Sequence, residues 1–326
     1  MGGGGDMSVI AGMDEAGLGP KLGPLVIGAT AFRVPDALSQ ADLWKVLVRG
    51  VTRWPGARVR KLVVADSKKV YSPQVGVGVL EETVLSFLAL SGQHRKRADE
   101  LLSALAGEDH DYSRRYPWYN DQVLELPLTG RALGSVKKAE RLRVTLAEAG
   151  VEFLGARVLP VFESALNEQF ARSDNKSDTL FTNAARLLSA LVRRYAEEGL
   201  IIVVDKHGGR DRYAPLLSRP FPHASFVIHG QGRTVSHYEL KGWSKPVHIS
   251  FVMSGEDASL PVALASMHAK YVRELYMLMF SNYWQMQAPE VKPTAGYGRD
   301  AGRFLREAAP AISRLNIPDH MLVRQR

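Results

Sequence analysis

Acidic residues follow directly after several apolar stretches of this sequence that are typical of buried strands. The residues in question are Asp14, Glu15, Asp205, Glu256 and Asp257. An ionised carboxylate beside a protein core is costly unless it is paired or binds a metal ion. If these side chains converge, they repel one another, and a divalent cation would resolve that repulsion. Each carboxylate taken alone is also compatible with an ordinary helix cap or turn residue.

The residue types available favour a hard cation at such a site. The 326 residues include no cysteine, which excludes a thiolate zinc site, a disulfide framework and a cysteine nucleophile. Oxygen ligands without regularly spaced histidines favour Mg²⁺ or Mn²⁺ over zinc. Two such ions a few ångströms apart can activate a water and stabilise a leaving oxygen in phosphoryl transfer.

The stretches that would position the carboxylates predict an α/β fold. Strands are expected over 8–13, 25–32, 62–65, 152–159, 200–205 and 247–253, and a hairpin over 224–240. The first two strands, joined by a turn rich in Gly and Pro, are expected to form an antiparallel pair. An amphipathic helix over 177–198 leads into the apolar strand that ends at Asp205, and this order is typical of α/β proteins.

Further helices are expected over 79–90, 139–149 and 259–283, followed by an irregular helical region at about 284–326. The stretch 91–138 has clustered charges and poor periodicity, so we interpret it as an insertion or small subdomain outside the main core. Its aromatic and basic run, 112–119, is compatible with stacking on single-stranded nucleic acid or with a packed edge.

The charge balance favours an anionic partner such as nucleic acid. Lysine and arginine number 42 against 34 aspartates and glutamates, which gives a net charge of +8. With 45% hydrophobic residues the chain can bury a sizeable core. No apolar run approaches the roughly 20 residues that span a bilayer. Residues 1–7 lack a signal-peptide pattern and are expected to be a flexible leader, and the lack of cysteine fits a cytoplasmic location.

Five short motifs occur in a fixed order along the chain. They are MDEAGLGPKLGPL at 13–25, DSKKV at 66–70, IVVD at 202–205, ALASMHAKYVRE at 263–274 and GYG at 296–298. In this order they resemble motifs of the type 2 ribonucleases H, the ribonuclease HII and HIII family, which carry DEAGRGPxxGP, DSKKL, a third carboxylate, AAASIxAKxxRD and GY(G/P). The stretch 91–138 has no counterpart in that pattern.

The resemblance implies a ribonuclease H-like fold, which is a mixed central sheet flanked by helices with a helical C-terminal part. One such domain would cover 8–326 and contain the insertion. The implied activity is cleavage of the RNA strand of RNA–DNA hybrids, or cleavage at ribonucleotides embedded in duplex DNA, leaving a 3′-hydroxyl. The implied cofactor is Mg²⁺ or Mn²⁺ alone. No membrane partner is expected, and a monomer is favoured.

The resemblance also assigns roles to individual residues. Asp14, Glu15 and Asp205 match three of the family's four metal-binding, catalytic carboxylates. The fourth carboxylate could be either of two adjacent residues. The family's spacing from Ser266 selects Glu256, whereas its commonest residue type selects Asp257, and we favour Asp257 slightly.

The turn at Gly17, Leu18 and Gly19 matches the family's GRG turn, whose backbone amides approach a ribose 2′-hydroxyl. Leu18 stands where the family has an arginine for a phosphate, so weaker binding or a changed register is expected, unless Lys21 compensates. Pro20 and the lack of a following helix argue against the alternative of a dinucleotide-binding loop.

Other residues are candidates for the remaining nucleic-acid contacts. They are Lys68, Lys69, Ser266, Lys270, Arg273 and Tyr297. Ser266, Lys270 and Arg273 share one face of a helix by their spacing, which is compatible with phosphate binding or with a solvated edge. By the resemblance, Tyr297 would stack at the RNA–DNA junction.

Two alternatives to the nuclease stay open. A non-catalytic nucleic-acid-binding relative is compatible with Leu18 and with the shifted fourth carboxylate. A metal-dependent nuclease with another substrate, such as structured RNA or DNA ends, is also compatible with the carboxylates. His207, two residues after Asp205, is a candidate for proton transfer or a polar turn residue.

Overall fold

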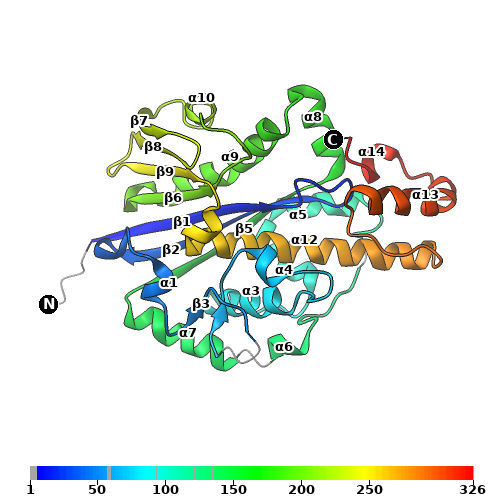
Figure 1. Ribbon diagram of the computed structural model, residues 1–326, viewed down its shortest axis with the longest axis horizontal. Coiled ribbons are helices and arrows are strands. Elements are labelled where there is room, and N and C mark those ends of the chain that lie inside the picture. The colour runs from blue at the N-terminus through cyan, green and yellow to red at the C-terminus, as the bar shows by residue number, and fades with distance from the viewer. Residues whose placement is uncertain (1–5, 57–59, 93, 121, 134–135, 326) are drawn as a thin grey trace.

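The computed structural model describes residues 6–56, 60–92, 94–120, 122–133 and 136–325. A seven-stranded mixed sheet lies at its centre, with helices on both faces and a helical C-terminal part (Figure 1). The predicted architecture is therefore confirmed. Residues 1–5 of the expected leader lie outside the described residues, and the first strand already begins at Met7.

The strand order in the sheet is β5–β2–β1–β6–β9–β8–β7. The strands are β1 (Met7–Ala16), β2 (Leu25–Pro35), β5 (Glu152–Val161), β6 (Leu200–Asp205), β7 (Ser225–Gln231), β8 (Val235–Lys241) and β9 (Val247–Val252). Strand β6 runs parallel to both of its neighbours, β1 and β9, and the other four pairs are antiparallel. A small second sheet pairs β3 (Val51–Thr52) with β4 (Leu62–Val63).

Two layers of helices cover the sheet. One layer includes α2 (Ser67–Val70), α3 (Gly78–Leu90), α4 (Ala98–Ala106), α7 (Val136–Glu148), α12 (Leu260–Gln287) and α13 (Gly298–Arg314). The other includes α8 (Glu163–Ser173), α9 (Lys176–Tyr195) and α10 (Ala214–Leu217). The short helices are α1 (Leu43–Val46), α5 (Glu108–Asp111), α6 (Gly130–Leu133), α11 (Gly255–Ala258) and α14 (Asp319–Leu322).

The alternation of side chains along β1 decides where its carboxylate lies. Val9, Ala11 and Met13 belong to the core beneath α9, whereas Ile10 belongs to the core beneath α12. Because successive side chains of a strand point to opposite faces, Asp14 projects from the face that α12 covers.

Two glycines allow α12 to lie directly against the sheet. A Cβ on Gly12 would stand 2.1 Å from the backbone nitrogen of Val262, and a Cβ on Gly28 would stand 2.5 Å from the carbonyl oxygen of Ala265. Such distances are far inside van der Waals contact. The start of α12 therefore lies close to β1 and β2, next to the strand ends that bear the carboxylates.

The substitution Gly12→Ala should accordingly destabilise the protein. The added methyl meets helix backbone rather than a movable side chain, so we expect a loss of about 3 kcal/mol in the free energy of unfolding. Urea denaturation measures the change. Gly209→Ala is the control because a Cβ there meets nothing within 4 Å, and equal stability of the two variants would contradict the close packing.

The stretch 91–138, expected to lie outside the main core, packs into it where it is described. Trp118 is fully buried, with its ring centroid 5.7 Å from that of Phe280 on α12. Tyr116 and Tyr119 are also buried and contact Phe162. Three aromatic rings of the 112–119 run are therefore core residues, which leaves no face of them for stacking on a base.

Within the described parts of the chain, no helix combines the length and the apolar character that crossing a lipid bilayer requires.

Candidate active site

The carboxylates at the strand ends come together because their strands are parallel neighbours. Met13 of β1 pairs with Val204 of β6, so the next residues, Asp14 and Asp205, lie side by side at the carboxyl ends of both strands. Asp205 pairs in turn with Val252 of β9. Short helix α11 follows β9, and its Gly255 donates its backbone N–H to Asp205 Oδ1 at 2.8 Å.

Helix α11 brings a further carboxylate to this place. Glu256 is only 8% exposed and forms a side-chain hydrogen bond with Asp205. Its Oε2 atom is buried and has no hydrogen-bond partner among the described residues. Glu15, the residue after Asp14, lies close enough to Asp205 and Glu256 for their charges to act on it. We call Asp14, Glu15, Asp205 and Glu256 the carboxylate cluster.

Burial and mutual repulsion disfavour full ionisation of the carboxylate cluster. Burial is the main cause that raises the pKa of Asp14 well above its usual range, and the charges of Glu15 and Asp205 raise it further. Burial, with the charge of Asp205, raises the pKa of Glu15 to about 7 and that of Glu256 to about 7. Burial also raises the pKa of Asp205. A cation placed among these groups would reverse this preference.

The donor set of the carboxylate cluster fits hard divalent cations. Its members offer only oxygen atoms, and the unpartnered Oε2 of Glu256 is one of them. Asp14, Asp205 and Glu256 are close enough for their charges or hydrogen bonds to shift one another's pKa, so an ion among them would be shared by several carboxylates. Lys68 is the nearby cation, with Nζ 3.9 Å from Glu256 Oε1, and its side chain is 83% exposed.

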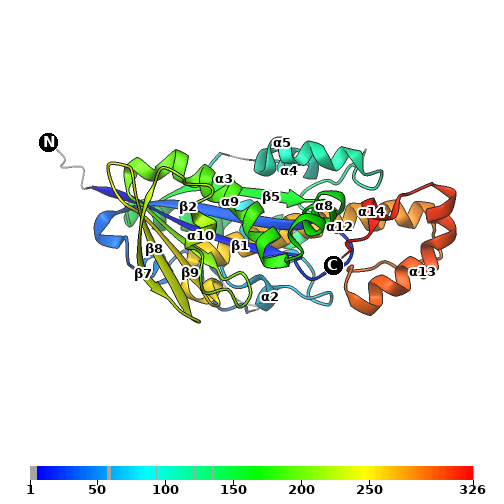
Figure 2. The same cartoon turned by 90° about the horizontal axis from the view of Figure 1, so that it is seen from above.

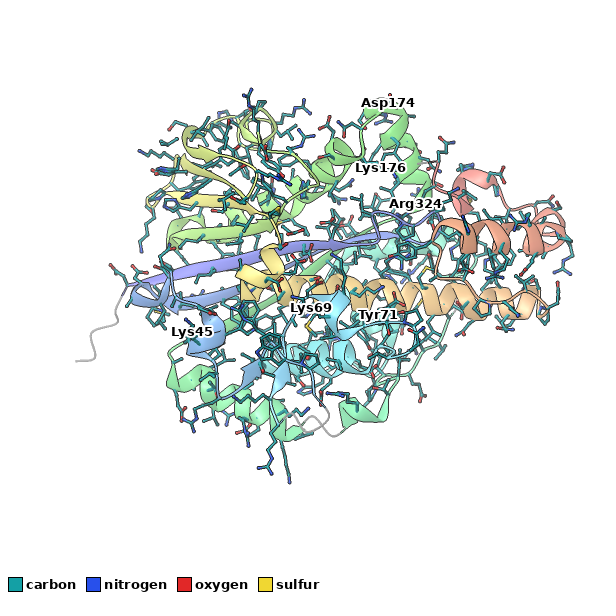
Figure 3. The ribbon with its side chains drawn as sticks, in the orientation of Figure 1. Lys45, Lys69, Tyr71, Asp174, Lys176 and Arg324 are labelled. Atoms are coloured by element: carbon teal, nitrogen blue, oxygen red, sulfur yellow. The ribbon has the colours of Figure 1, made fainter. Side chains whose placement is uncertain are left out.

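The two candidates for the fourth carboxylate lie in different places. Glu256 belongs to the carboxylate cluster, whereas the side chain of Asp257 is 55% exposed and forms an ion pair with Lys69. Lys69 lies on α2, close to α12 (Figure 3). The spacing from Ser266, which selects Glu256, therefore agrees with the structure better than the residue type, which selects Asp257. Our slight preference for Asp257 does not match this placement.

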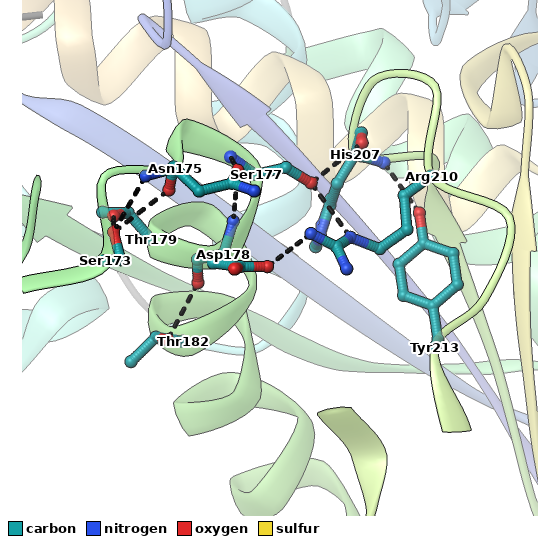
Figure 4. Close-up of polar contacts among 9 residues, drawn as sticks. All are labelled: Ser173, Asn175, Ser177, Asp178, Thr179, Thr182, His207, Arg210 and Tyr213. Carbon is teal, nitrogen blue, oxygen red and sulfur yellow. Dashed lines mark hydrogen bonds and ion pairs between the residues drawn. The ribbon is translucent and has the colours of Figure 1, made fainter. Parts of the chain in front are cut away.

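The loop after Asp205 is anchored to the start of α9 (Figure 4). Arg210 forms an ion pair with Asp178 and donates from Nε to Ser177 Oγ at 3.1 Å. The Ser177 hydroxyl donates to the carbonyl oxygen of His207 at 3.2 Å. These contacts fix the end of β6 and thereby the position of Asp205.

His207 itself is part of the core. Its ring packs against those of Phe181, Tyr213 and Phe251, and burial lowers its pKa to about 3. The ring is therefore neutral at physiological pH. His207 is therefore a packed core residue near the site. Its ring is buried from solvent, so it is poorly placed to transfer a proton.

An arginine of α12 packs against the turn formed by Gly17, Leu18 and Gly19. Gly17 has φ +87°, and a Cβ there would lie 2.3 Å from Arg273 Nε, so only glycine fits. Arg273 is 1% exposed, donates to the Leu22 carbonyl oxygen at 3.2 Å and lies 5.6 Å from the ring centroid of Tyr297. Arg273 therefore stabilises the conformation of the turn. Leu18 packs partly against the core beneath α9.

The other candidates for nucleic-acid contacts lie on α12 and near the C-terminus. Ser266 is buried and donates to the Asp14 carboxylate, and its Oγ lies at hydrogen-bond distance, 3.1 Å, from Ser67 Oγ. Lys270 forms a 2.6 Å ion pair with Glu274 and lies over the ring of Tyr71. Tyr297 is 47% exposed, so its ring is accessible to a ligand.

Sequence reasoning missed a second arginine at the turn. Arg324, buried near the C-terminus, donates to the carbonyl oxygens of both Gly17 and Gly23 (Figure 3). Its own backbone N–H donates to the Lys21 carbonyl oxygen at 2.9 Å, and the Lys21 N–H donates to Gly296 at 2.7 Å. The turn, Tyr297 and the C-terminal residues therefore form one unit. No sequence signal marks Arg324, because about 300 residues separate it from its partners.

No protein-family model and no curated protein matches this chain. The chain is similar to solved structures of ribonucleases HII and HIII. A ribonuclease HII from Archaeoglobus fulgidus, solved in complex with PCNA, is 18% identical, with 98% of this chain and 94% of that chain covered and a TM-score of 0.48. Ribonuclease H2 from Pyrococcus horikoshii OT3 is 15% identical, with 96% and 92% covered and a TM-score of 0.42. Bst-RNase HIII in complex with Mn²⁺ is 15% identical, with 98% and 66% covered and a TM-score of 0.41.

Proposed function

We propose that this protein is a metal-dependent endoribonuclease that cleaves the RNA strand of RNA–DNA hybrids, or duplex DNA at embedded ribonucleotides. The observation that carries the proposal is the carboxylate cluster, whose four members meet at the carboxyl ends of β1 and β6 and beside α11. The motif resemblance supplies the substrate class. The net charge of +8 supports an anionic substrate.

Asp14, Glu15, Asp205 and Glu256 would hold Mg²⁺ or Mn²⁺. When bound, these ions supply activation of a water and stabilisation of the leaving 3′-oxygen. The protein contributes the geometry. Gly255 orients the Asp205 carboxylate through its N–H, and Ser266 orients that of Asp14.

The turn at residues 17–19 would select the ribonucleotide. Its backbone amides, fixed by the two buried arginines beneath it, would meet the 2′-hydroxyl that distinguishes RNA from DNA. Tyr297, half-exposed beside the turn, offers an aromatic face to a sugar or base. Lys68 would lie near the scissile phosphate because it is the exposed cation next to the carboxylate cluster.

A cleavage assay on three substrates tests this function. The substrates are an RNA–DNA hybrid, a DNA duplex with one ribonucleotide, and plain duplex DNA, each with Mg²⁺ or Mn²⁺. We expect cleavage of the hybrid, of the single-ribonucleotide duplex or of both, and none of plain DNA. If both ribonucleotide substrates stay intact, the proposal fails, and tight metal-independent hybrid binding would then indicate the non-catalytic alternative.

Metal binding should also stabilise the folded protein. The carboxylate cluster exists only in the folded chain, so Mn²⁺ at about 100 times its dissociation constant should add about 2.7 kcal/mol to the free energy of unfolding. Calorimetric scans with Mn²⁺ and with EDTA measure this difference. The Asp205→Asn variant is the control, and an equal gain in that variant would place the ion elsewhere.

A further inference from the structure

Three histidines and a glutamate lie together at the edge of the sheet, away from the carboxylate cluster. His229 lies on β7, His237 and Glu239 on β8, and His248 on β9. Glu239 pairs directly with His248 across the two strands, and His237 pairs with Ser250, so these side chains share one face of the sheet. Figure 2 shows these strands at the opposite end of the molecule from α13 and α14.

The opposite face of these strands packs on the core. The three histidines and Glu239 lie on the other face and are not part of that core. Tyr238, Leu240, Ile249 and Phe251 alternate with them and are fully buried beneath α9 and α10. The face with the histidines is partly exposed. A metal ion can therefore reach it without any rearrangement of the core.

The side-chain atoms lie close enough together to converge on one ion after small side-chain adjustments. His229 Nε2 is 2.7 Å from Glu239 Oε2, and one ligand atom from each of His229, Glu239 and His248 lies within 4.8 Å of the other two. Among the described residues, this is the one group of three that meets this spacing. His237 Nε2 stands 3.4 Å from His248 Nδ1 and can hold that ring in place.

We infer that His229, Glu239 and His248 form a binding site for a divalent transition metal of the Zn²⁺ class, with His237 as a positioning residue. Imidazole ligands favour Zn²⁺ over the hard cations that suit the carboxylate cluster. Three protein ligands leave at least one position of the ion for water. Lys241 Nζ lies 3.3 Å from Glu239 Oε1, so Glu239 also has a cationic neighbour on its other oxygen.

The site joins all three strands of the sheet edge. Among the described residues β7 is the last strand of the sheet and pairs with β8 alone, and this pairing is irregular between Ile228 and Gly230, next to His229. A bound ion would tie this edge strand to β9. The inference does not depend on nuclease activity, because it concerns a different set of residues and is measured by binding.

Zinc titration of the metal-stripped protein without a polyhistidine tag tests the site. The Asp205→Asn variant serves as the background, so that ions bound by the carboxylate cluster contribute little. We expect one Zn²⁺ per chain, measured by calorimetry, and a tetrahedral Co²⁺ absorption spectrum in the same site. His229→Asn and His248→Asn should each weaken Zn²⁺ binding by more than about 100-fold, and His237→Asn by roughly 10- to 100-fold.

His223→Asn is the matched control, because His223 is an exposed histidine just before β7. This variant should bind Zn²⁺ as the background protein does. The inference is overturned if the background protein binds no Zn²⁺, or if the His229 and His248 variants bind it as tightly as the His223 variant does. These outcomes are independent of whether the protein cleaves any nucleic acid.

Discussion

The Asp205→Asn variant should lose cleavage by about 10³-fold or more and, without metal, should be more stable than the original protein. The first effect follows because Asp205 is the central carboxylate, in contact with Gly255 and Glu256 and beside Asp14. A 10³-fold loss corresponds to about 4 kcal/mol of lost transition-state stabilisation.

The second effect follows from the raised pKa of Asp205, which burial causes. A folded-state pKa above the unfolded value means that ionisation costs stability, so stability falls as the pH rises through that pKa. Asparagine resembles the protonated form and avoids this cost. We expect the variant to be more stable in EDTA at pH 8 and to show no such gain at pH 3, where the Asp205 carboxyl is mostly protonated in the folded and in the unfolded chain.

Single-turnover cleavage and thermal unfolding in EDTA measure the two effects on the same preparations. Asp174→Asn is the control. Asp174 is exposed and has a left-handed conformation, with φ 50°, that asparagine adopts readily. A variant that keeps its activity, or that is less stable than the original protein in EDTA at pH 8, would contradict the assigned role of Asp205.

Glu256→Gln and Asp257→Asn should have opposite outcomes although the two residues are adjacent. Glu256 belongs to the carboxylate cluster, and its loss should lower kcat/KM on the hybrid by about 10²- to 10³-fold. Asp257 is exposed and paired with Lys69, and surface ion pairs contribute little, so its variant should stay within about twofold.

Steady-state cleavage of one hybrid substrate at saturating Mn²⁺ compares these variants. Each acts as the control for the other, since both remove one negative charge from α11. If Asp257→Asn is the inactive variant, the metal ligand is Asp257 and α11 must turn when the ion binds. Equal activity of both variants would indicate that neither carboxylate of α11 is a metal ligand.

Most elements of the fold could be predicted because their signals are local. The apolar run 200–205 and the stripe of 177–198 predict β6 and α9 almost residue for residue. The adjacent positions of Asp14 and Asp205 follow from the parallel pairing of β1 and β6, which the periodicity of the sequence does not predict.

The parts that the sequence did not predict depend on tertiary contacts. Ser254, which precedes α11 and thus Glu256 and Asp257, has a left-handed conformation, with φ 55°, that the sequence did not indicate. The ring of Trp118 finds its place only against α12. Arg324 reaches the turn at Gly17 from the far end of the chain. None of these features is marked in the sequence by a periodic pattern or a motif.

Hydrolysis of the RNA strand by the carboxylate cluster is proposed to require bound divalent metal. One measurement tests it most directly, namely the ends of the products when a 5′-labelled RNA strand in a hybrid is incubated with Mn²⁺ or with EDTA. We expect fragments with 3′-hydroxyl ends that form with Mn²⁺ and not with EDTA. Intact RNA in both reactions, or fragments with 2′,3′-cyclic phosphate ends that form equally in EDTA, would contradict it.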